Sequence, residues 1–322
     1  MYRKALKMEG FEGVEKRLEM AFSTGARLRQ KLTEEALAGI LEPVECYIIS
    51  SKSEEHVDAY LLSTSSCFVH DDRIIVKTCG KTTIFKCMAG IIRTASPQVV
   101  TSVLYTRGEF IWPEKQPSPH KSLADENAHL KELVKSIPGL KVMDPLVTGN
   151  ENMWHVLGAF STAEVKAEED VVTVEMSMKG LDTEKASVFF KKTSSNMTEA
   201  SGVKCIFPGA KLDAYDFEPC GYSMNGVEGK AVSTIHVAPE VGSSFASFEV
   251  FGYDFKRGKK FNEVVTQVLA TFKPKKFTLT IHSTTVRLNG NEPEFLLDLG
   301  GYTCSEKKVK HLGHGSIIYY CF

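Results

Sequence analysis

Short apolar runs separated by polar turns dominate the chain, and they predict a β-rich fold. β-branched and other apolar side chains are dense in these runs, as they are in strands. The runs that predict strands are Val44–Ser50, Val57–Leu62, Ile74–Cys79, Val99–Tyr105, Met153–Phe160, Val171–Met178, Val232–Val237, Phe245–Phe251, Phe277–His282 and Ile317–Phe322. Helical periodicity occurs in Val14–Phe22, Thr83–Arg93, Asp125–Ser136 and Asn262–Phe272, and in the shorter Asp182–Phe190, with Asp182 as its N-cap.

The order of these elements favours antiparallel sheets. Strand clusters are punctuated by single helices and do not alternate strictly with them, so we predict an α+β fold with helices on the outer faces of antiparallel sheets. Each half of the chain holds several strands and a helix, which hints at a duplicated unit. The polar stretch Lys191–Gly202, rich in Ser, Thr and Asn, predicts a mobile loop between the halves.

Composition and charge narrow the class of protein. The 322 residues are enough for one large domain or two ordinary ones, and the net charge of −1 gives no broad attraction to nucleic acid or membranes. No run of ~18 apolar residues predicts a membrane span, and Met1 to Phe11 lacks the apolar centre of a secretory signal. The eight cysteines form no CxxC pair, so we interpret them as reduced thiols of a cytoplasmic protein. His311 and His314 form an HxxH with no cysteine pair nearby, and no metal site is expected.

Four segments differ from ordinary scaffold. Glu12, Glu15 and Glu19 have helical spacing, which is typical of a solvated helix face. Four hydroxyl residues, Ser63 to Ser66, lie between apolar flanks and are typical of a turn. Cys79 ends an apolar strand, where a cysteine is usually a small buried hydrophobe. The fourth segment joins a glycine-rich stretch that predicts a tight hairpin, Pro219–Gly226, to a β run that contains a histidine, Ser233–Glu240.

In combination these segments carry a family resemblance. FEGVEKRLE, LSTSS, KTCG, PCGYSMNG and STIHVAPE occur in the order seen in eukaryotic S-adenosylmethionine decarboxylases, from about Phe11 to at least His282. YTRGEF and GLDTEKASVFFK resemble the plant branch of the family. The resemblance implies a four-layer αββα sandwich of two face-to-face antiparallel sheets, related by internal duplication. It implies one compact domain over residues 1–322, with a monomer favoured over a homodimer.

The resemblance also implies a proenzyme that cleaves itself between Thr64 and Ser65. Ser65 would attack the carbonyl of Thr64, Ser223 would stabilise the cyclic intermediate, and His236 would remove the α-proton of residue 65. The products would be a β chain of residues 1–64 and an α chain of residues 65–322. The new terminus would be a pyruvoyl group, an electron sink that replaces pyridoxal phosphate and needs no metal.

Matched positions then suggest the site for S-adenosylmethionine. Cys79 would reprotonate the α-carbon after carbon dioxide leaves. Phe11 and Phe217 would sandwich the adenine, and Glu240 would hold the ribose hydroxyls. Glu12 and Glu15 would be active-site acids, with Glu15 also needed for processing. Leu62 and Thr64 complete the expected substrate-binding set. The product would be the aminopropyl donor of spermidine and spermine synthesis.

A charged regulatory site follows from the same resemblance. Mammalian-type members bind putrescine at a buried acidic site, which is matched here by Glu19, Thr173, Glu175 and Glu249, whereas Val171 replaces an aspartate. Arg17 and His282 stand where plant-type members carry cations in place of putrescine, so we expect putrescine-independent activity. Leu104 lies where plant members usually offer a second arginine.

The cleavage motif departs from the family at one position. The family reads LSESS, and Thr64 replaces its glutamate. Threonine is β-branched and uncharged, and a misplaced reacting atom can cost ~100-fold in rate. An active pyruvoyl decarboxylase and a non-processing paralogue that regulates an active decarboxylase are therefore both considered, as is an unrelated β-rich binding protein. The retention of Ser65, Cys79, Ser223 and His236 favours the enzyme.

Overall fold

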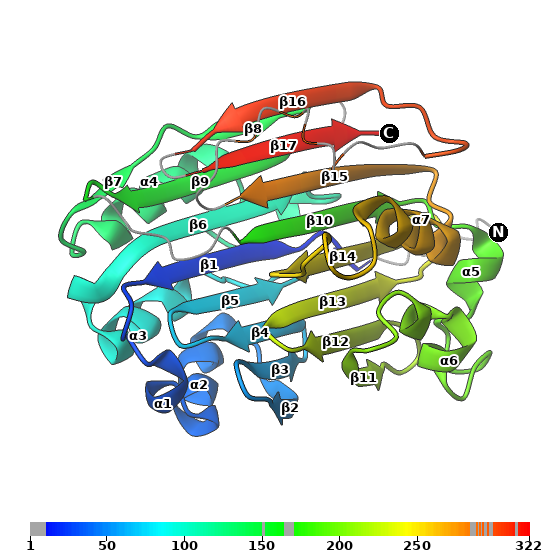
Figure 1. The fold of residues 1–322 in the computed structure, drawn as a ribbon, viewed down its shortest axis with the longest axis horizontal. Coiled ribbons are helices and arrows are strands. Elements are labelled where there is room, and N and C mark those ends of the chain that lie inside the picture. Colours follow the sequence, from blue (N-terminus) through cyan, green and yellow to red (C-terminus); the bar gives the residue numbers. More distant parts are fainter. Residues whose placement is uncertain are drawn as a thin grey trace, which may run out of the picture.

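The structure is a computed structural model, and two antiparallel sheets form its centre (Figure 1). It describes residues 11–149, 152–163, 171–283, 299–312 and 315–322, together with 288, 290, 292 and 295. The first sheet contains β1 (Lys16–Phe22), β2 (Ile48–Ser53), β3 (Asp58–Leu62), β4 (Ser65–Val69), β5 (Arg73–Thr78), β6 (Val100–Gly108), β7 (Leu140–Val142), β8 (Leu146–Thr148) and β9 (Trp154–Ser161). The second contains β10 (Val172–Lys179), β11 (Lys211–Asp216), β12 (Tyr222–Glu228), β13 (Ala231–Ala238), β14 (Phe245–Phe251), β15 (Lys276–Ser283), β16 (Glu306–His311) and β17 (Ser316–Cys321).

The two sheets share one topology. The first has the strand order β2-β3-β4-β5-β1-β6-β9-β7, with β8 beside β9, and the second has the order β11-β12-β13-β14-β10-β15-β17-β16. In each sheet the first strand of the half lies at the centre, between a four-strand meander and the strand that follows it. This correspondence agrees with the predicted internal duplication.

Helices cover one face of each sheet. The α-helices are α1 (Leu28–Lys31), α2 (Glu34–Leu41), α3 (Lys86–Ala95), α4 (Leu123–Val134), α5 (Thr183–Ser187), α6 (Met197–Ser201) and α7 (Phe261–Phe272). Helices α1–α4 share one apolar cluster with the first sheet, and α5–α7 share another with the second. The other faces of the sheets meet, because residues of both sheets form three further clusters. The predicted αββα sandwich is confirmed, and Asp182 caps α5 as predicted.

Three local predictions were wrong. Residues 16–22, predicted as part of a helix, form the central strand β1, and both faces of this strand are buried. Leu18, Met20 and Phe22 face the helix layer, whereas Arg17 and Glu19 face the second sheet. This period of two was obscured because the inner face is charged. The other two errors are at Tyr222–Glu228, where a strand replaces most of the predicted hairpin, and at Lys191–Gly202, which lies within the second half and contains α6.

The space between the sheets is apolar at its flanks and charged at its centre. Val57, Phe68 and Phe251 belong to one flanking cluster, and Trp154 and Tyr319 belong to another. Between them, β1, β5, β10 and β14 place arginine, lysine and glutamate side chains that are almost fully buried. Buried charges need partners, so this layer is the natural place to look for function.

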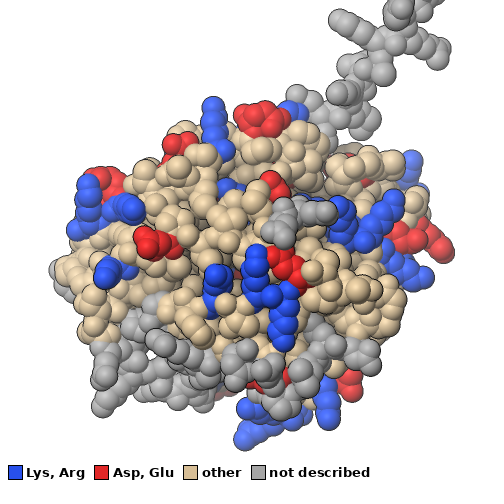
Figure 2. Space-filling view, turned by 90° about the horizontal axis from the view of Figure 1, so that it is seen from above, with Lys and Arg blue, Asp and Glu red and all other residues tan. Residues whose placement is uncertain are grey.

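The outer surface shows no comparable concentration of charge on the face drawn in Figure 2. Basic and acidic side chains are interspersed there. Among the described helices, none is long and apolar enough to cross a membrane.

Candidate active site

The predicted cleavage site lies at a tight β-hairpin. Leu62 pairs with Ser65 across β3 and β4, so Ser63 and Thr64 are the two loop residues. The predicted turn is confirmed for these two residues, whereas Ser65 and Ser66 begin β4 and are fully buried. The Thr64–Ser65 peptide bond therefore joins a partly exposed turn to a buried strand.

The Ser65 hydroxyl faces an acid and a histidine. Its Oγ donates to Glu15 Oε1 at 2.7 Å and lies 3.3 Å from His236 Nδ1. His236 Nδ1 is itself 2.5 Å from the same Glu15 oxygen. Burial would raise the pKa of Glu15, but Lys77 and His236 lower it well below its usual value. The carboxylate is therefore charged and accepts a hydrogen bond from the serine hydroxyl.

The carbonyl of Thr64 is held by Cys79. It accepts the Cys79 N–H at 3.0 Å and the Cys79 Sγ–H at 2.8 Å. Burial, followed by the charge of Glu15, raises the pKa of this thiol far above its usual value, so it stays protonated. Two donors on one carbonyl oxygen form the arrangement that stabilises a developing oxyanion.

Buried side chains fix the loop that carries Cys79. Thr82 Oγ1 donates to the Cys79 carbonyl at 3.1 Å, and Lys16 Nζ donates to the Gly80 carbonyl at 2.9 Å. Burial lowers the pKa of Lys16 to about 8. Gly80 has a φ of +66°, and a β-carbon there would lie 3.3 Å from the Phe11 ring. The positive φ favours glycine, and a β-carbon at this position would push the Phe11 ring aside.

Three residues that the sequence reasoning did not assign orient His236. Ser66 Oγ lies 3.1 Å from His236 Nε2 and donates to Asn225 Oδ1 at 2.5 Å, and Thr234 Oγ1 lies 3.3 Å from Nε2. Ser66 and Asn225 are within the quoted motifs, but nothing in the motifs alone indicates their hydrogen bonds. Ser223 lies opposite His236 in the β12–β13 register. In the described part of the chain it makes no hydrogen bond to Ser65 or Thr64.

The predicted substrate-binding residues surround this end of the sheets. Phe11 is 45% exposed beside Gly80, and Glu12 accepts the N–H groups of Val14 and Trp112. Burial raises the pKa of Glu12. Leu62 is buried.

Phe217 and Glu240 follow strands of the second sheet. Phe217 follows β11, and its N–H donates to the Gly221 carbonyl. Among the described residues its ring contacts Tyr215 and not Phe11. Glu240 follows β13, and its Oε2 is buried without a hydrogen-bond partner in the described residues. A buried carboxylate oxygen without a donor fits a site that receives ligand hydroxyls.

The predicted charged site adjoins Glu15 through a buried ion network. Lys77 Nζ lies 3.0 Å from Glu15 Oε2 and 2.8 Å from Glu249 Oε2. Arg17 Nε lies 2.8 Å from Glu249 Oε1 and 4.0 Å from Glu175 Oε1. The sequence motifs indicate no role for Lys77. Its position directly after Ile74, Ile75 and Val76 on one predicted strand nevertheless favours a buried charge.

The far end of the network is Glu19. One of its oxygens is 2.8 Å from an Arg17 nitrogen, and the other contacts Arg73. His282 and Thr173 pair across β15 and β10 and are buried, and His282 is close enough to affect Glu19 electrostatically. Burial raises the pKa of Glu175 to about 7, with a further contribution from Glu249.

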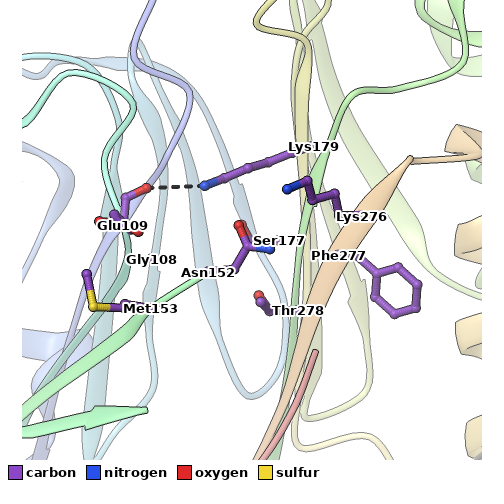
Figure 3. Close-up of a pocket in the computed structure, with 9 residues that line it drawn as sticks. All are labelled: Gly108, Glu109, Asn152, Met153, Ser177, Lys179, Lys276, Phe277 and Thr278. Carbon is purple, nitrogen blue, oxygen red and sulfur yellow. Dashed lines mark hydrogen bonds between the residues drawn. The ribbon is translucent and has the colours of Figure 1, made fainter. Parts of the chain in front are cut away.

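A crevice between the sheets lies away from these residues (Figure 3). Its lining includes Gly108, Asn152, Ser177 and Thr278. Lys179 reaches across it towards the Glu109 carbonyl, at 3.4 Å. None of the predicted catalytic residues lines it.

Metal ligands and disulfides are not features of the described chain. No group of three His, Cys, Asp or Glu residues is placed to hold a metal within the described ranges. His314 of the HxxH pair lies outside them. All eight cysteines are free thiols.

Comparison with known proteins defines the family. The sequence profile of adenosylmethionine decarboxylase matches residues 8–322. S-adenosylmethionine decarboxylase proenzymes are similar over nearly the whole chain. The Pisum sativum protein is 44% identical over 97% of this chain and 92% of its own length, and the Brassica juncea proenzyme 3 is 42% identical over 99% and 90%. The chain belongs to the adenosylmethionine decarboxylase family, in its plant-type branch, and is an S-adenosylmethionine decarboxylase.

A solved structure supports the fold. The Trypanosoma brucei AdoMetDC-delta26 monomer matches with a TM-score of 0.58 and 20% identity, over 79% of this chain and 97% of that one. At this identity the likeness is one of fold.

Proposed function

We propose that the chain cleaves itself between Thr64 and Ser65 and that the pyruvoyl group formed at residue 65 serves the decarboxylation of S-adenosylmethionine. The observation that carries the proposal is the arrangement around one peptide bond. The nucleophile is hydrogen-bonded to a charged acceptor, and the carbonyl to be attacked accepts two donors from Cys79. This arrangement supports an acyl transfer from the Thr64 carbonyl to the Ser65 hydroxyl.

In the first step the Ser65 Oγ attacks the Thr64 carbonyl carbon. Glu15 accepts the hydroxyl proton, and Cys79 stabilises the charge that develops on the carbonyl oxygen. The C–N bond then breaks, the nitrogen leaves as an amine, and an ester links Thr64 to the Ser65 side chain. Ser223 lies on the inner face beside His236, where a hydroxyl can support the cyclic intermediate.

In the second step His236 takes the α-proton of residue 65. The Cβ–O bond of the ester breaks, and Thr64 leaves with the former serine oxygen in its carboxylate. The enamine left on residue 65 takes up water and loses ammonia, which gives the pyruvoyl terminus. Ser66 and Thr234, beside Nε2, hold the imidazole with its Nδ1 towards residue 65.

The two chains would stay together after cleavage. The β chain supplies β1, which lies between β5 and β6 of the α chain, and β3, which pairs with β4. Separation would require the first sheet to be dismantled, so residues 1–64 and 65–322 act as one domain.

In decarboxylation the pyruvoyl carbonyl supplies the electron sink. The burial and high pKa of Cys79 support its role as the neutral proton donor to the α-carbon. Phe11 offers an exposed ring for the adenine, with Phe217 as its proposed counterpart, and the unpartnered Glu240 Oε2 suits the ribose hydroxyls. The product would supply aminopropyl groups for spermidine and spermine.

Threonine at position 64 is compatible with this chemistry. Its Oγ1 lies 2.9 Å from Cys46 Sγ, so the side chain has a partner away from Cys79, and the carbonyl keeps both donors. The reacting groups are therefore not displaced, which favours the enzyme over a non-processing paralogue.

Arg17 supports activity without putrescine. Its guanidinium is buried among Glu19, Glu175 and Glu249, and it occupies the charged layer with a permanent cation. Arginine does not lose its charge in proteins, so the acids need no diamine to balance them.

The proposal is tested by following purified wild type and Ser65→Ala on a denaturing gel, with ¹⁴CO₂ release from carboxyl-labelled S-adenosylmethionine. We expect two chains and gas release from the wild type, and one uncut, inactive chain from the variant. Gas release from uncut Ser65→Ala would overturn the proposal. Wild-type rates with and without putrescine should agree within about twofold, since the coupling energy would be near zero.

A further inference from the structure

Glu19 ends the buried ion network, and two guanidiniums bind it from different strands. Arg17 on β1 contacts Oε2, and Arg73 at the start of β5 contacts Oε1. Both arginines form ion pairs with Glu19, and His282 is near enough to affect its pKa. The side chain of Glu19 is only 3% exposed, so its charge depends on them.

On its other side, Glu19 has an apolar residue of β6 opposite it. In the β1–β6 register Glu19 lies opposite Leu104, which packs into the apolar cluster with Trp154. On β5 it lies opposite Ile75. Arg73 reaches Glu19 from two residues earlier in β5, and its guanidinium lies over the Phe251 ring of the second sheet, 5.3 Å from the centroid. This ring holds the guanidinium between the two sheets.

The contacts continue without a break from Arg73 to the reacting serine. They run through Glu19, Arg17, Glu249 and Lys77 to Glu15. Glu15 binds the Ser65 hydroxyl and His236. Arg73 and Thr78 are the two ends of β5, and Thr78 pairs with Ser65. At ~3.3 Å per residue the relay therefore spans roughly 16 Å.

We propose that Arg73 is a positioning residue for the reaction: it is the second internal cation of the charged site, supplied from β5 where β6 offers only Leu104. Without Arg73, Glu19 depends more on Arg17, which is drawn away from Glu249. Lys77 then shifts towards Glu249, and Glu15, left in a buried site with less cationic charge beside it, is driven towards its protonated form, which cannot accept the Ser65 proton. Arg73 touches neither the substrate nor the reacting atoms, so its effect is carried by the network.

The inference rests on the proposed self-cleavage, and chemical rescue tests it. Arg73→Ala, Arg73→Gln and Arg73→Lys are compared with the wild type for the rate of conversion of the 35.7 kDa chain into two chains. Arg73→Gln keeps more of the side-chain volume in case the alanine variant does not fold. Guanidinium chloride at low millimolar concentration replaces the deleted group, with tetramethylammonium chloride as the ionic-strength control. Arg29→Ala is the matched variant, since Arg29 pairs with Asp58 away from the network.

We expect Arg73→Ala and Arg73→Gln to cleave at least tenfold more slowly than the wild type, and Arg73→Lys within about threefold, because lysine keeps the charge but not the fork. Guanidinium should restore the neutral variants at least fivefold and leave the wild type and Arg29→Ala unchanged. Wild-type rates in the neutral variants, or slow cleavage that guanidinium does not restore, would overturn the role of Arg73. A wild type that never cleaves would instead overturn the proposed function.

Discussion

Lys77 provides the most direct energetic test of the buried network. It is 2% exposed and bridges Glu15 of the first sheet side to Glu249 of the second. Burial would lower the pKa of its amine, but Glu15 and Glu249 raise it above the usual value, so Lys77 is charged at every physiological pH. Lys77→Met keeps most of the volume and leaves two buried carboxylates with one cation fewer.

The loss of one partner from a buried ion pair costs about 3–5 kcal/mol. Lys211 offers a matched control, because its pair with Glu54 is largely exposed on the lysine side, and exposed pairs contribute about 0–1 kcal/mol. Both changes are made in a Ser65→Ala background, so that every chain stays uncut. The free energy of unfolding is measured by urea denaturation with circular dichroism.

The result expected is a loss of at least 3 kcal/mol for Lys77→Met and of at most about 1 kcal/mol for Lys211→Met. In the Ser65 parent, Lys77→Met should also slow cleavage, because without that cation the buried Glu15 becomes protonated and can no longer accept the proton of Ser65. If the two methionine variants lose equal stability, the buried network does not hold the sheets together and the reasoning fails.

Three further predictions concern single residues. Glu175→Gln should stabilise the uncut chain by up to about 3 kcal/mol above pH 7 and by little at pH 4.5. The folded-state pKa of Glu175 is about 7, so its ionisation destabilises the fold as the pH rises from 4.5 to 7. Melting curves of the variant and the parent across that range check this prediction, and a stability difference that does not change with pH would contradict it. Cys79→Ala should slow cleavage by about 10–100-fold, since the backbone N–H of residue 79 remains, and should abolish decarboxylation. His236→Ala should stop at the ester intermediate, which hydroxylamine cleaves. If Cys79→Ala lost cleavage and decarboxylation equally, the separate roles of Cys79 and His236 would be refuted. Gly80→Ala should raise KM several-fold by displacing Phe11 and leave cleavage within about threefold; an unchanged KM would place the adenine elsewhere.

Regular elements could be predicted where one face of a strand or helix is apolar. The sequence predicts Phe245–Phe251 with the observed bounds, because Ala246, Phe248 and Val250 form one continuous apolar face, although Glu249 on the other face is charged. The sequence does not predict the strand β1, because its inner face carries Arg17 and Glu19. In a sequence, buried charged residues cannot be told from the charged residues of a solvent-exposed helix face. Their partners include Arg73 on the neighbouring strand and Glu249 on the opposite sheet, which the letters of β1 alone do not indicate.

Some residues of the candidate site could likewise be predicted from the sequence, and others could not. Ser65, Cys79 and His236 could be matched from motifs, since each lies in a short characteristic segment. Arg73 and Asn225 could not be given roles, because their partners, Glu19 and Ser66, are more than 50 residues away in the chain. Such pairings arise only from sheet register and from the packing of one sheet on the other.

The central claim is that Ser65 becomes the catalytic carbonyl, and intact mass analysis of the purified wild-type protein tests it most directly. The account predicts two chains, with Thr64 at the end of the smaller one and a larger chain lighter by one ammonia than a serine terminus would give. A single chain of 35.7 kDa after long incubation, or a larger chain that begins with an intact serine, would contradict it.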